Sequence, residues 1–161
     1  FNKISFEEVN KLSNLYNNLI YVTEINTDEY FGLSKIEAIK NATKKFNSKV
    51  KILLIFSNPR DIFNFPLKCM VQNRSCNIDK SQDFESRKLE NLLKEINNLM
   101  KVNDDIFFYN TYENLCPTNN CFSYNSDKDF LMLRDANHLS VEAADSIVES
   151  VRKFINNKIL N

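Results

Sequence analysis

The sequence predicts an α/β domain, a three-layer sandwich in which helices cover both faces of a parallel sheet. Three observations support this prediction. Amphipathic segments with helical spacing alternate with short apolar runs of strand length along the whole chain. The chain has 161 residues, the size of one domain, and 43% of them are hydrophobic, enough to bury a core. No repeat or interdomain linker divides the chain, so we expect a single domain over residues 1–161.

Each expected helix has a starting signal or a clear apolar face. Residues 5–8 and 34–37 have the Ser-x-x-Glu pattern of a capping box, which opens a helix. The third helix has apolar residues at helical spacing, and the last follows Ser140, a preferred N-cap type. The strands are apolar runs, of which residues 50–56 form the strongest and residues 19–25 are expected to be buried. In chain order we expect a helix of about 14 residues from Phe6, a strand over 19–25, a helix over 36–46, a strand over 50–56, a helix over 89–100, a strand over 106–109 and a helix after Ser140.

Two loop-like segments contain all four cysteines, Cys69 and Cys76 in the first and Cys116 and Cys121 in the second. The first segment, residues 60–83, is long for a loop, and such loops are often functional. Four cysteines allow three pairings, and the two local pairs would close short loops. Two loop disulfides indicate an oxidising compartment, whereas the alternative is four buried free thiols in a cytosolic protein. Zinc sites more often show tighter Cys-x-x-Cys pairs, so we expect no metal.

The charge balance and hydropathy exclude several classes of partner. The 21 basic and 21 acidic side chains cancel, which argues against binding to nucleic acid or to an anionic membrane. No apolar run approaches the roughly 18 residues that a membrane-spanning helix needs. The chain starts at Phe1 without a signal peptide, which indicates a fragment or a processed product.

The candidate active-site residues are His138, the only histidine, and Asp135, three positions before it. Histidine is the side chain best suited to move protons near neutral pH, and a carboxylate can fix its tautomer and orientation. On a non-helical turn the two side chains can reach each other. A parallel sheet binds ligands beyond the carboxyl ends of its strands, so we expect this turn to gather there with residues 23–26, 57–60 and 110–112. The alternative is that His138 only caps or packs.

The stretch Asp135-x-x-His138-Leu-Ser, followed by the small pair Ala143-Ala144, resembles the last block of SGNH/GDSL-type hydrolases. It is most similar to the SGNH domain of OafA-like acyltransferase family 3 proteins, over roughly residues 19–160. The resemblance implies a flavodoxin-like SGNH hydrolase fold, in which Asp135 and His138 complete a Ser-His-Asp triad. Cysteine pairs occur in the matching loops of these domains, so the resemblance also implies disulfides.

The resemblance further implies an O-acyltransferase or carbohydrate esterase, without a cofactor, whose substrates are an acyl donor and a cell-surface glycan acceptor. Acetyl is the expected acyl group. We expect a periplasmic or other extracytoplasmic location, with the domain tethered to a bacterial inner membrane through an upstream acyltransferase membrane domain. The alternative within the same fold is a non-catalytic domain that binds glycans or serves assembly. Arg134 stands beside the acidic residue and is either a surface charge or a contact for an anionic donor or glycan.

The serine nucleophile is not evident, because the family's Gly-Asp-Ser block does not occur in this chain. We expect that the first strand and its serine lie on a segment upstream of Phe1. The sheet should then have an unfilled central strand position, or a second chain that fills it. Two internal serines are weaker candidates. Ser34 lies in a Gly-x-Ser sequence that resembles a nucleophile elbow, and Ser57 directly follows the strongest strand.

Overall fold

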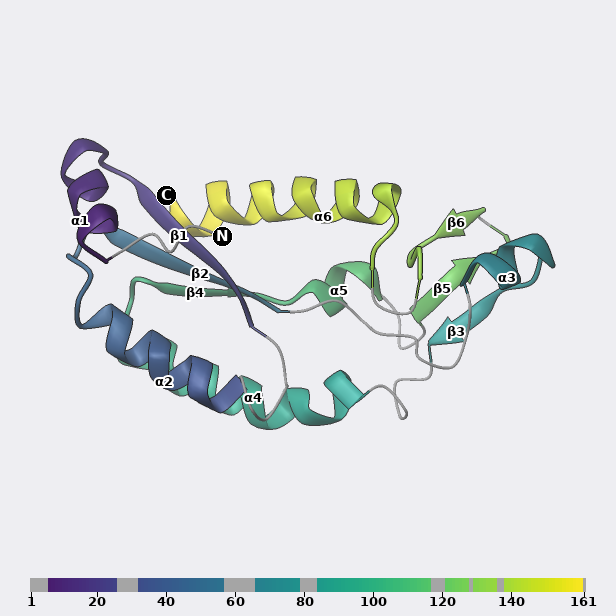
Figure 1. The fold of residues 1–161 in the computed structure, drawn as a ribbon, viewed down its shortest axis with the longest axis horizontal. Coiled ribbons are helices and arrows are strands. Elements are labelled where there is room, and N and C mark those ends of the chain that lie inside the picture. The colour runs from purple at the N-terminus through teal and green to yellow at the C-terminus, as the bar shows by residue number, and fades with distance from the viewer. Residues whose placement is uncertain are drawn as a thin grey trace.

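The computed structural model forms an elongated α/β domain with a parallel sheet at its centre and a smaller sheet at one end (Figure 1). It describes residues 6–25, 32–56, 66–78, 84–116, 121–127, 129–135 and 138–160. In chain order the elements are α1 (Phe6–Leu15), β1 (Leu19–Ile25), α2 (Gly32–Thr43), β2 (Val50–Phe56), α3 (Pro66–Val71), β3 (Cys76–Ile78), α4 (Phe84–Lys101), β4 (Ile106–Tyr109), α5 (Thr111–Leu115), β5 (Cys121–Asn125), β6 (Phe130–Leu131), α6 (Val141–Phe154) and a π-helical turn, η1 (Ile155–Ile159).

The main sheet is parallel and has the strand order β1-β2-β4. β1 pairs with β2 along its whole length, from Leu19 opposite Val50 to Ile25 opposite Phe56. β4 pairs with the other edge of β2 over four residues. The three strands coincide with the apolar runs expected from the sequence, which confirms the predicted α/β class with a parallel sheet.

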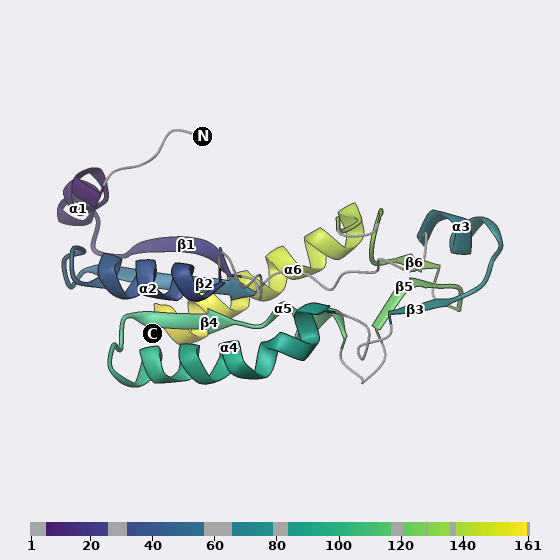
Figure 2. The same cartoon turned by 60° about the horizontal axis from the view of Figure 1, so that its bottom comes forward.

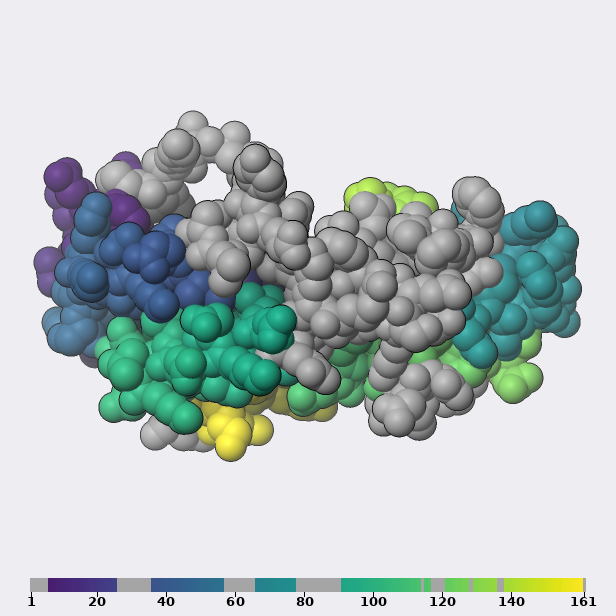
Figure 3. All heavy atoms as spheres, turned by 90° about the horizontal axis from the view of Figure 1, so that it is seen from below, coloured from purple at the N-terminus to yellow at the C-terminus, as the bar shows by residue number. Residues whose placement is uncertain are grey.

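Helices cover the two faces of this sheet in separate layers. Figures 1 and 2 show α2 and α4 on one face and α6 on the other, and in Figure 3 α2 and α4 lie side by side. β2 is buried by both layers, because its side chains alternate between the two faces. Ile52, Leu54 and Phe56 pack with the layer of α2 and α4, and Leu53 and Ile55 pack with α6. The central strand is therefore almost wholly apolar in sequence.

The expected vacant position inside the sheet is not present, so this prediction was wrong. β1 and β2 are hydrogen-bonded neighbours over seven consecutive pairs, which leaves no room for a strand between them. Pairing of this kind satisfies the backbone groups that the two strands turn toward each other. Within the described residues, the open edges of the sheet are instead the outer sides of β1 and β4. β1 was expected to be buried, but as an edge strand it leaves Val22 51% exposed.

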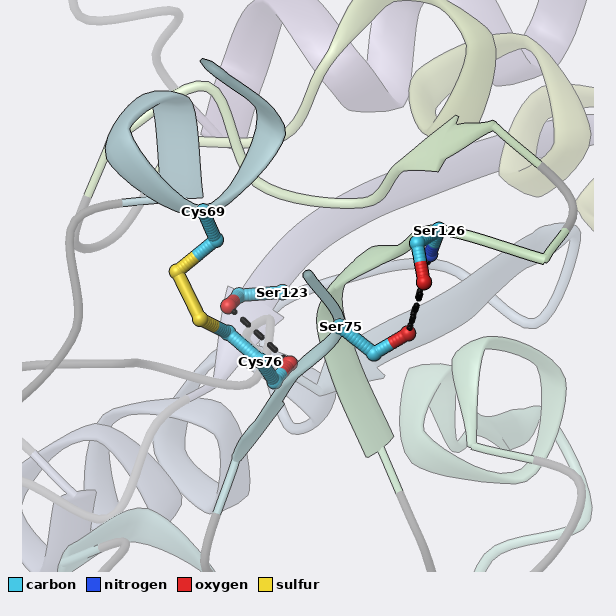
Figure 4. The surroundings of a disulfide bond; sticks show 5 residues. All are labelled: Cys69, Ser75, Cys76, Ser123 and Ser126. Carbon is cyan, nitrogen blue, oxygen red and sulfur yellow. Dashed lines mark hydrogen bonds between the residues drawn. A yellow bond between two sulfur atoms is a disulfide. The ribbon is translucent and has the colours of Figure 1, made fainter. Parts of the chain in front are cut away.

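The two segments expected to be irregular contain regular structure. They contribute α3, α5 and a second, antiparallel sheet with the order β3-β5-β6. A disulfide between Cys69 and Cys76 joins α3 to β3, and the Ser123 hydroxyl donates a hydrogen bond to the Cys76 carbonyl at 3.3 Å (Figure 4). Beside it, the hydroxyls of Ser75 and Ser126 lie 2.8 Å apart. This lobe is held by the disulfide and by contacts between distant segments.

Helix boundaries differ from the expected ones at the N-terminal half. α1 has 10 residues rather than about 14, and Val9 is the buried apolar residue on the face that was expected to pack. Ser5, the expected cap of α1, lies outside the described residues. α2 begins at Gly32, two residues before the expected cap Ser34. At the other end, Ser140 caps α6 as expected, with its hydroxyl accepting from the Ala143 amide at 3.0 Å.

Candidate active site

The candidate site is built on a closed turn between β6 and α6. Leu133 and Leu139 form an isolated antiparallel bridge across the turn. The Arg134 amide donates to the His138 carbonyl at 2.8 Å, and the Ser140 amide donates to the Met132 carbonyl at 2.9 Å. Leu133 is fully buried and Met132 is buried beside it, so apolar packing anchors the turn on one side. Arg134 and His138, which continue the turn, are exposed.

The structure brings the two predicted residues into direct contact. Nδ1 of His138 lies 2.8 Å from each carboxylate oxygen of Asp135. The backbone N–H of His138 also donates to Asp135 Oδ1, at 2.9 Å. The contact was predicted from the spacing of three residues, and the geometry confirms the contact. The second hydrogen bond, from the backbone amide, was not predicted. The catalytic roles of the two residues remain a prediction.

The contact fixes how the imidazole is presented. A carboxylate only accepts hydrogen bonds, so Nδ1 carries the hydrogen, and in the neutral ring Nε2 is a free acceptor site. The His138 side chain is 63% exposed and that of Asp135 is 46% exposed, so the ring is open to an incoming group. An imidazole held in this tautomer can accept a proton at Nε2, and the carboxylate stabilises the imidazolium that forms.

The turn lies beyond the carboxyl ends of the parallel strands (Figure 1). α5 follows β4 directly, and the Thr111 hydroxyl donates to the Phe56 carbonyl at the end of β2, at 3.1 Å. The first turn of α6 then packs against α5, where Ala143 is fully buried in the same apolar cluster as Leu115. Of the other strand ends expected at this edge, residues 110–112 are present, while 26 and 57–60 lie outside the described residues.

Arg134 makes a weak contact with the pair. Its Nε lies 3.7 Å from Asp135 Oδ2, and its side chain is 65% exposed. An exposed ion pair of this length contributes little to stability. The contact does place a positive charge beside the carboxylate, on the exposed side of the turn.

No serine is found at the imidazole within the described residues. There, the hydrogen bonds of the His138 ring go to Asp135. The hydroxyl of Ser140 caps α6, and that of Ser123 is buried against the Cys76 carbonyl. Ser57 and the side chain of Ser34 lie outside the described part of the chain, so neither candidate is placed relative to the ring.

The disulfides support the elements on both sides of the turn. Cys116 at the end of α5 is bonded to Cys121 at the start of β5, with a Cα–Cα distance of 4.7 Å. Cys69–Cys76 is the other pair, so both bonds are the local ones. Disulfides fit an oxidising compartment. In the portion of the chain that the structure covers, His, Cys, Asp and Glu form no group of three that could hold a metal ion.

Fold and site together define a class of protein. A parallel α/β sheet with a histidine–carboxylate pair beyond the carboxyl ends of its strands is the arrangement of a hydrolase-like or acyltransferase-like domain. The chain belongs to the family of SGNH domains that are fused to AT3 domains, because the model of this family matches residues 8–153. No curated protein and no solved structure matches the chain. Among the described helices, none combines the length and the apolar character that crossing a membrane requires.

Proposed function

We propose that this domain carries the histidine and the carboxylate of a serine acyl-transfer centre, and that it adds acyl groups to, or removes them from, cell-surface glycans. The observation that carries the proposal is the double contact of Asp135 with His138 Nδ1 at 2.8 Å, which leaves Nε2 exposed as the base. Membership in the family of SGNH domains fused to AT3 domains supports the same chemistry.

In the proposed reaction, Nε2 of His138 takes the hydroxyl proton of a serine while the serine oxygen attacks the acyl carbonyl of the donor. The tetrahedral intermediate collapses to an acyl-serine, and the imidazolium returns the proton to the departing donor group. Nε2 then removes the proton of a glycan hydroxyl or of water, whose oxygen attacks the acyl-serine. The second intermediate collapses, the acyl group leaves with the new oxygen, and the imidazolium returns the proton to the serine oxygen. Asp135 stabilises the imidazolium in both steps and holds the ring in place.

We propose that the serine is supplied by a segment outside these 161 residues. The absence of a Gly-Asp-Ser block supports this assignment, as does the fusion of related domains to AT3 domains. The AT3 fusion also favours an upstream membrane domain as the source of the acyl group. The two disulfides favour the extracytoplasmic side of the membrane.

Labelling with a fluorophosphonate, which reacts with activated serines, tests the proposal. The protein should be produced both as the 161-residue chain and with its natural upstream sequence, and the labelled peptide identified by mass spectrometry. We expect labelling in the longer protein, on a serine upstream of Phe1, and loss of labelling in His138→Gln. Labelling of Ser34 or Ser57 in the shorter chain would instead show that the nucleophile belongs to this domain.

A non-catalytic role in glycan binding or assembly is the second candidate. It is favoured by one observation, that the His138 ring contacts Asp135 and no serine within the described residues. If the longer protein is inert to the probe and hydrolyses no acetyl ester, the binding role replaces the catalytic one.

A further inference from the structure

A hollow of about 530 Å³ lies along the open edge of β4, between α4 and α6. It is separate from the His138 turn and is formed by the part of α6 that lies against the main sheet; Figures 1 and 2 show α4 and α6 on opposite faces of that sheet. Its polar lining comes from α4, the end of β4, α5 and the C-terminal half of α6 with η1. The polar residues around it are Asn97, Tyr109, Asn110, Glu113, Ser150, Lys153, Asn157 and Lys158.

The buried polar group in this lining is the hydroxyl of Tyr109. The residue is only 4% exposed, and its ring packs edge-on against Phe154 with the centroids 5.5 Å apart. Among the described residues, its hydroxyl makes no well-formed hydrogen bond. The Ser150 hydroxyl, also in the lining, still lowers the pKa of this phenol as a hydrogen-bonding neighbour, so the Tyr109 hydroxyl has capacity for one further partner. A ligand or an ordered water in the hollow can supply that partner.

The phenol is a donor at neutral pH. Burial raises the pKa of Tyr109 and outweighs the lowering effect of the Ser150 hydroxyl, while the negative charge of Glu113 raises the pKa further. The neutral phenol can therefore donate a hydrogen bond into the hollow while its oxygen accepts from the Ser150 hydroxyl.

The charges around the hollow favour a negatively charged ligand. Lys153 and Lys158 are both exposed beside it. Lys153 has an ion pair with Glu149, but the pair is 3.6 Å long and solvent-exposed, so it is weak. Glu113 is the acidic residue of the lining, and the Asn110 amide donates to it at 3.2 Å. The lining thus carries two lysines and one glutamate, an excess of one positive charge.

The remaining lining combines amides with aromatic rings. Asn97 and Asn157 offer both donors and acceptors, which suits the hydroxyls of a sugar. Phe108 and Phe154 offer apolar area, which suits the C–H face of a sugar ring. Phosphate alone would use the lysines and leave the amides and rings unexplained. We propose that the hollow binds an anionic sugar unit of a glycan, held by Tyr109, Lys153 and Lys158.

The position of the hollow fits an acceptor glycan that also reaches the active site, a point that rests on the proposed function. Ser150 follows Ser140 by 10 residues of α6. At 1.5 Å per residue this separation is about 15 Å along the helix axis. A chain of a few sugar units spans such a distance, so one unit can occupy the hollow while another lies at His138.

Binding can be measured by NMR titration of the 161-residue chain with two probes of equal length, tetragalacturonate and the neutral maltotetraose. We expect tetragalacturonate to shift the side-chain amide signals of Asn97 and Asn157, and maltotetraose to bind at least about tenfold more weakly, because charged hydrogen bonds are lost. Tyr109→Phe should raise the Kd for tetragalacturonate about threefold to tenfold, because one hydrogen bond is removed without a change of shape.

The matched charge variants are Lys153→Gln and Lys49→Gln. Lys153→Gln should weaken tetragalacturonate binding, whereas Lys49→Gln, an exposed lysine before β2, should not. Equal affinity for the two probes, or shifts that ignore Tyr109→Phe and Lys153→Gln, would overturn the proposal. So would a dimer joined through the β4 edge that excludes both probes.

In this design, a failure of the binding proposal can be distinguished from a failure of the acyl-transfer proposal. The shifts that tetragalacturonate causes at Asn97 and Asn157 should persist in the His138→Gln variant, since His138 does not line the hollow. Hydrolysis of p-nitrophenyl acetate by the longer protein tests the acyl-transfer proposal without any glycan. If the protein binds the tetrasaccharide but does not hydrolyse the ester, the proposed glycan subsite stands and the proposed acyl-transfer activity is wrong.

Discussion

The carboxylate of Asp135 accepts two hydrogen bonds from the same residue, one from the backbone amide of His138 at 2.9 Å and one from its Nδ1 at 2.8 Å. The backbone bond fixes where the carboxylate lies, and the side-chain bond then fixes the ring. Orientation of the imidazole is therefore a local property of a four-residue turn. This makes the pair a suitable support for a base even where both side chains are exposed.

Asp135→Asn should separate orientation from charge. An asparagine oxygen can still accept from the His138 amide, so the turn should persist, but the amide no longer stabilises the imidazolium. In the serine-bearing protein we expect kcat to fall by about 10²–10⁴-fold with little change in Tm. Asp145→Asn, an exposed substitution on α6, is the matched control and should leave both values unchanged. Unaltered ester hydrolysis in Asp135→Asn would remove Asp135 from the mechanism.

Ser140→Ala should destabilise the domain through the start of α6. The Ser140 hydroxyl accepts from the Ala143 amide, and loss of such a cap costs about 1 kcal/mol. Because Ser140 also closes the turn that carries His138, we expect a small fall in activity with it. Urea denaturation measures the free energy of unfolding. Ser146→Ala, at an exposed position inside α6, should cost nothing, and a similar loss there would point to a general sensitivity of the helix.

The two disulfides should differ in their effect on the site. Each closes a short loop, with sequence separations of 7 and 5, and removing either should cost about 2–3 kcal/mol. Replacing Cys116 and Cys121 by serine releases α5 from β5, and these two elements contact α6 and β6, which flank the His138 turn. Replacing Cys69 and Cys76 loosens the distal lobe instead. We therefore expect larger changes in the NMR signals of His138 for the first double variant, and equal changes for both would contradict this assignment.

Stability should fall at alkaline pH through Tyr109. Burial raises the pKa of this phenol above its value of 10.0 in the unfolded chain, so the folded state holds the proton more tightly. Its contribution to stability is complete below pH 10 and is lost as the pH rises through the folded pKa. Tyr109→Phe should lose less stability than wild type between neutral pH and pH 11. Tyr16→Phe, at an exposed tyrosine, is the control and should follow the wild-type curve.

Strands with a strong local signal could be predicted from the sequence. The runs over 19–25, 50–56 and 106–109 match β1, β2 and β4, because buried parallel strands are continuous apolar runs. The Asp135–His138 contact was predictable because it is also local, since the two residues are only three positions apart on one turn.

The small antiparallel sheet could not be predicted in this way. β3, β5 and β6 have three, five and two residues, too few to show a period. Their pairing joins Cys76 to Tyr124, far apart in sequence, and depends on a disulfide and on packing. Strand order is likewise a long-range property, which is why the predicted vacancy between β1 and β2 was wrong. The hollow beside Tyr109 also required the structure, because five elements from two distant parts of the chain contribute to it, α4, β4 and α5 from one and α6 and η1 from the other.

The exposed edge of β1 affects the solubility of this domain when it is produced by itself. Within the described residues, one side of β1 is uncovered, and Tyr21 and Val22 are partly exposed, so this strand is a template for pairing with other molecules. In concentrated solution, the domain should therefore aggregate through this edge. Natural sheets protect such edges with lysine, and a lysine in place of Val22 changes no residue of the turn that carries His138.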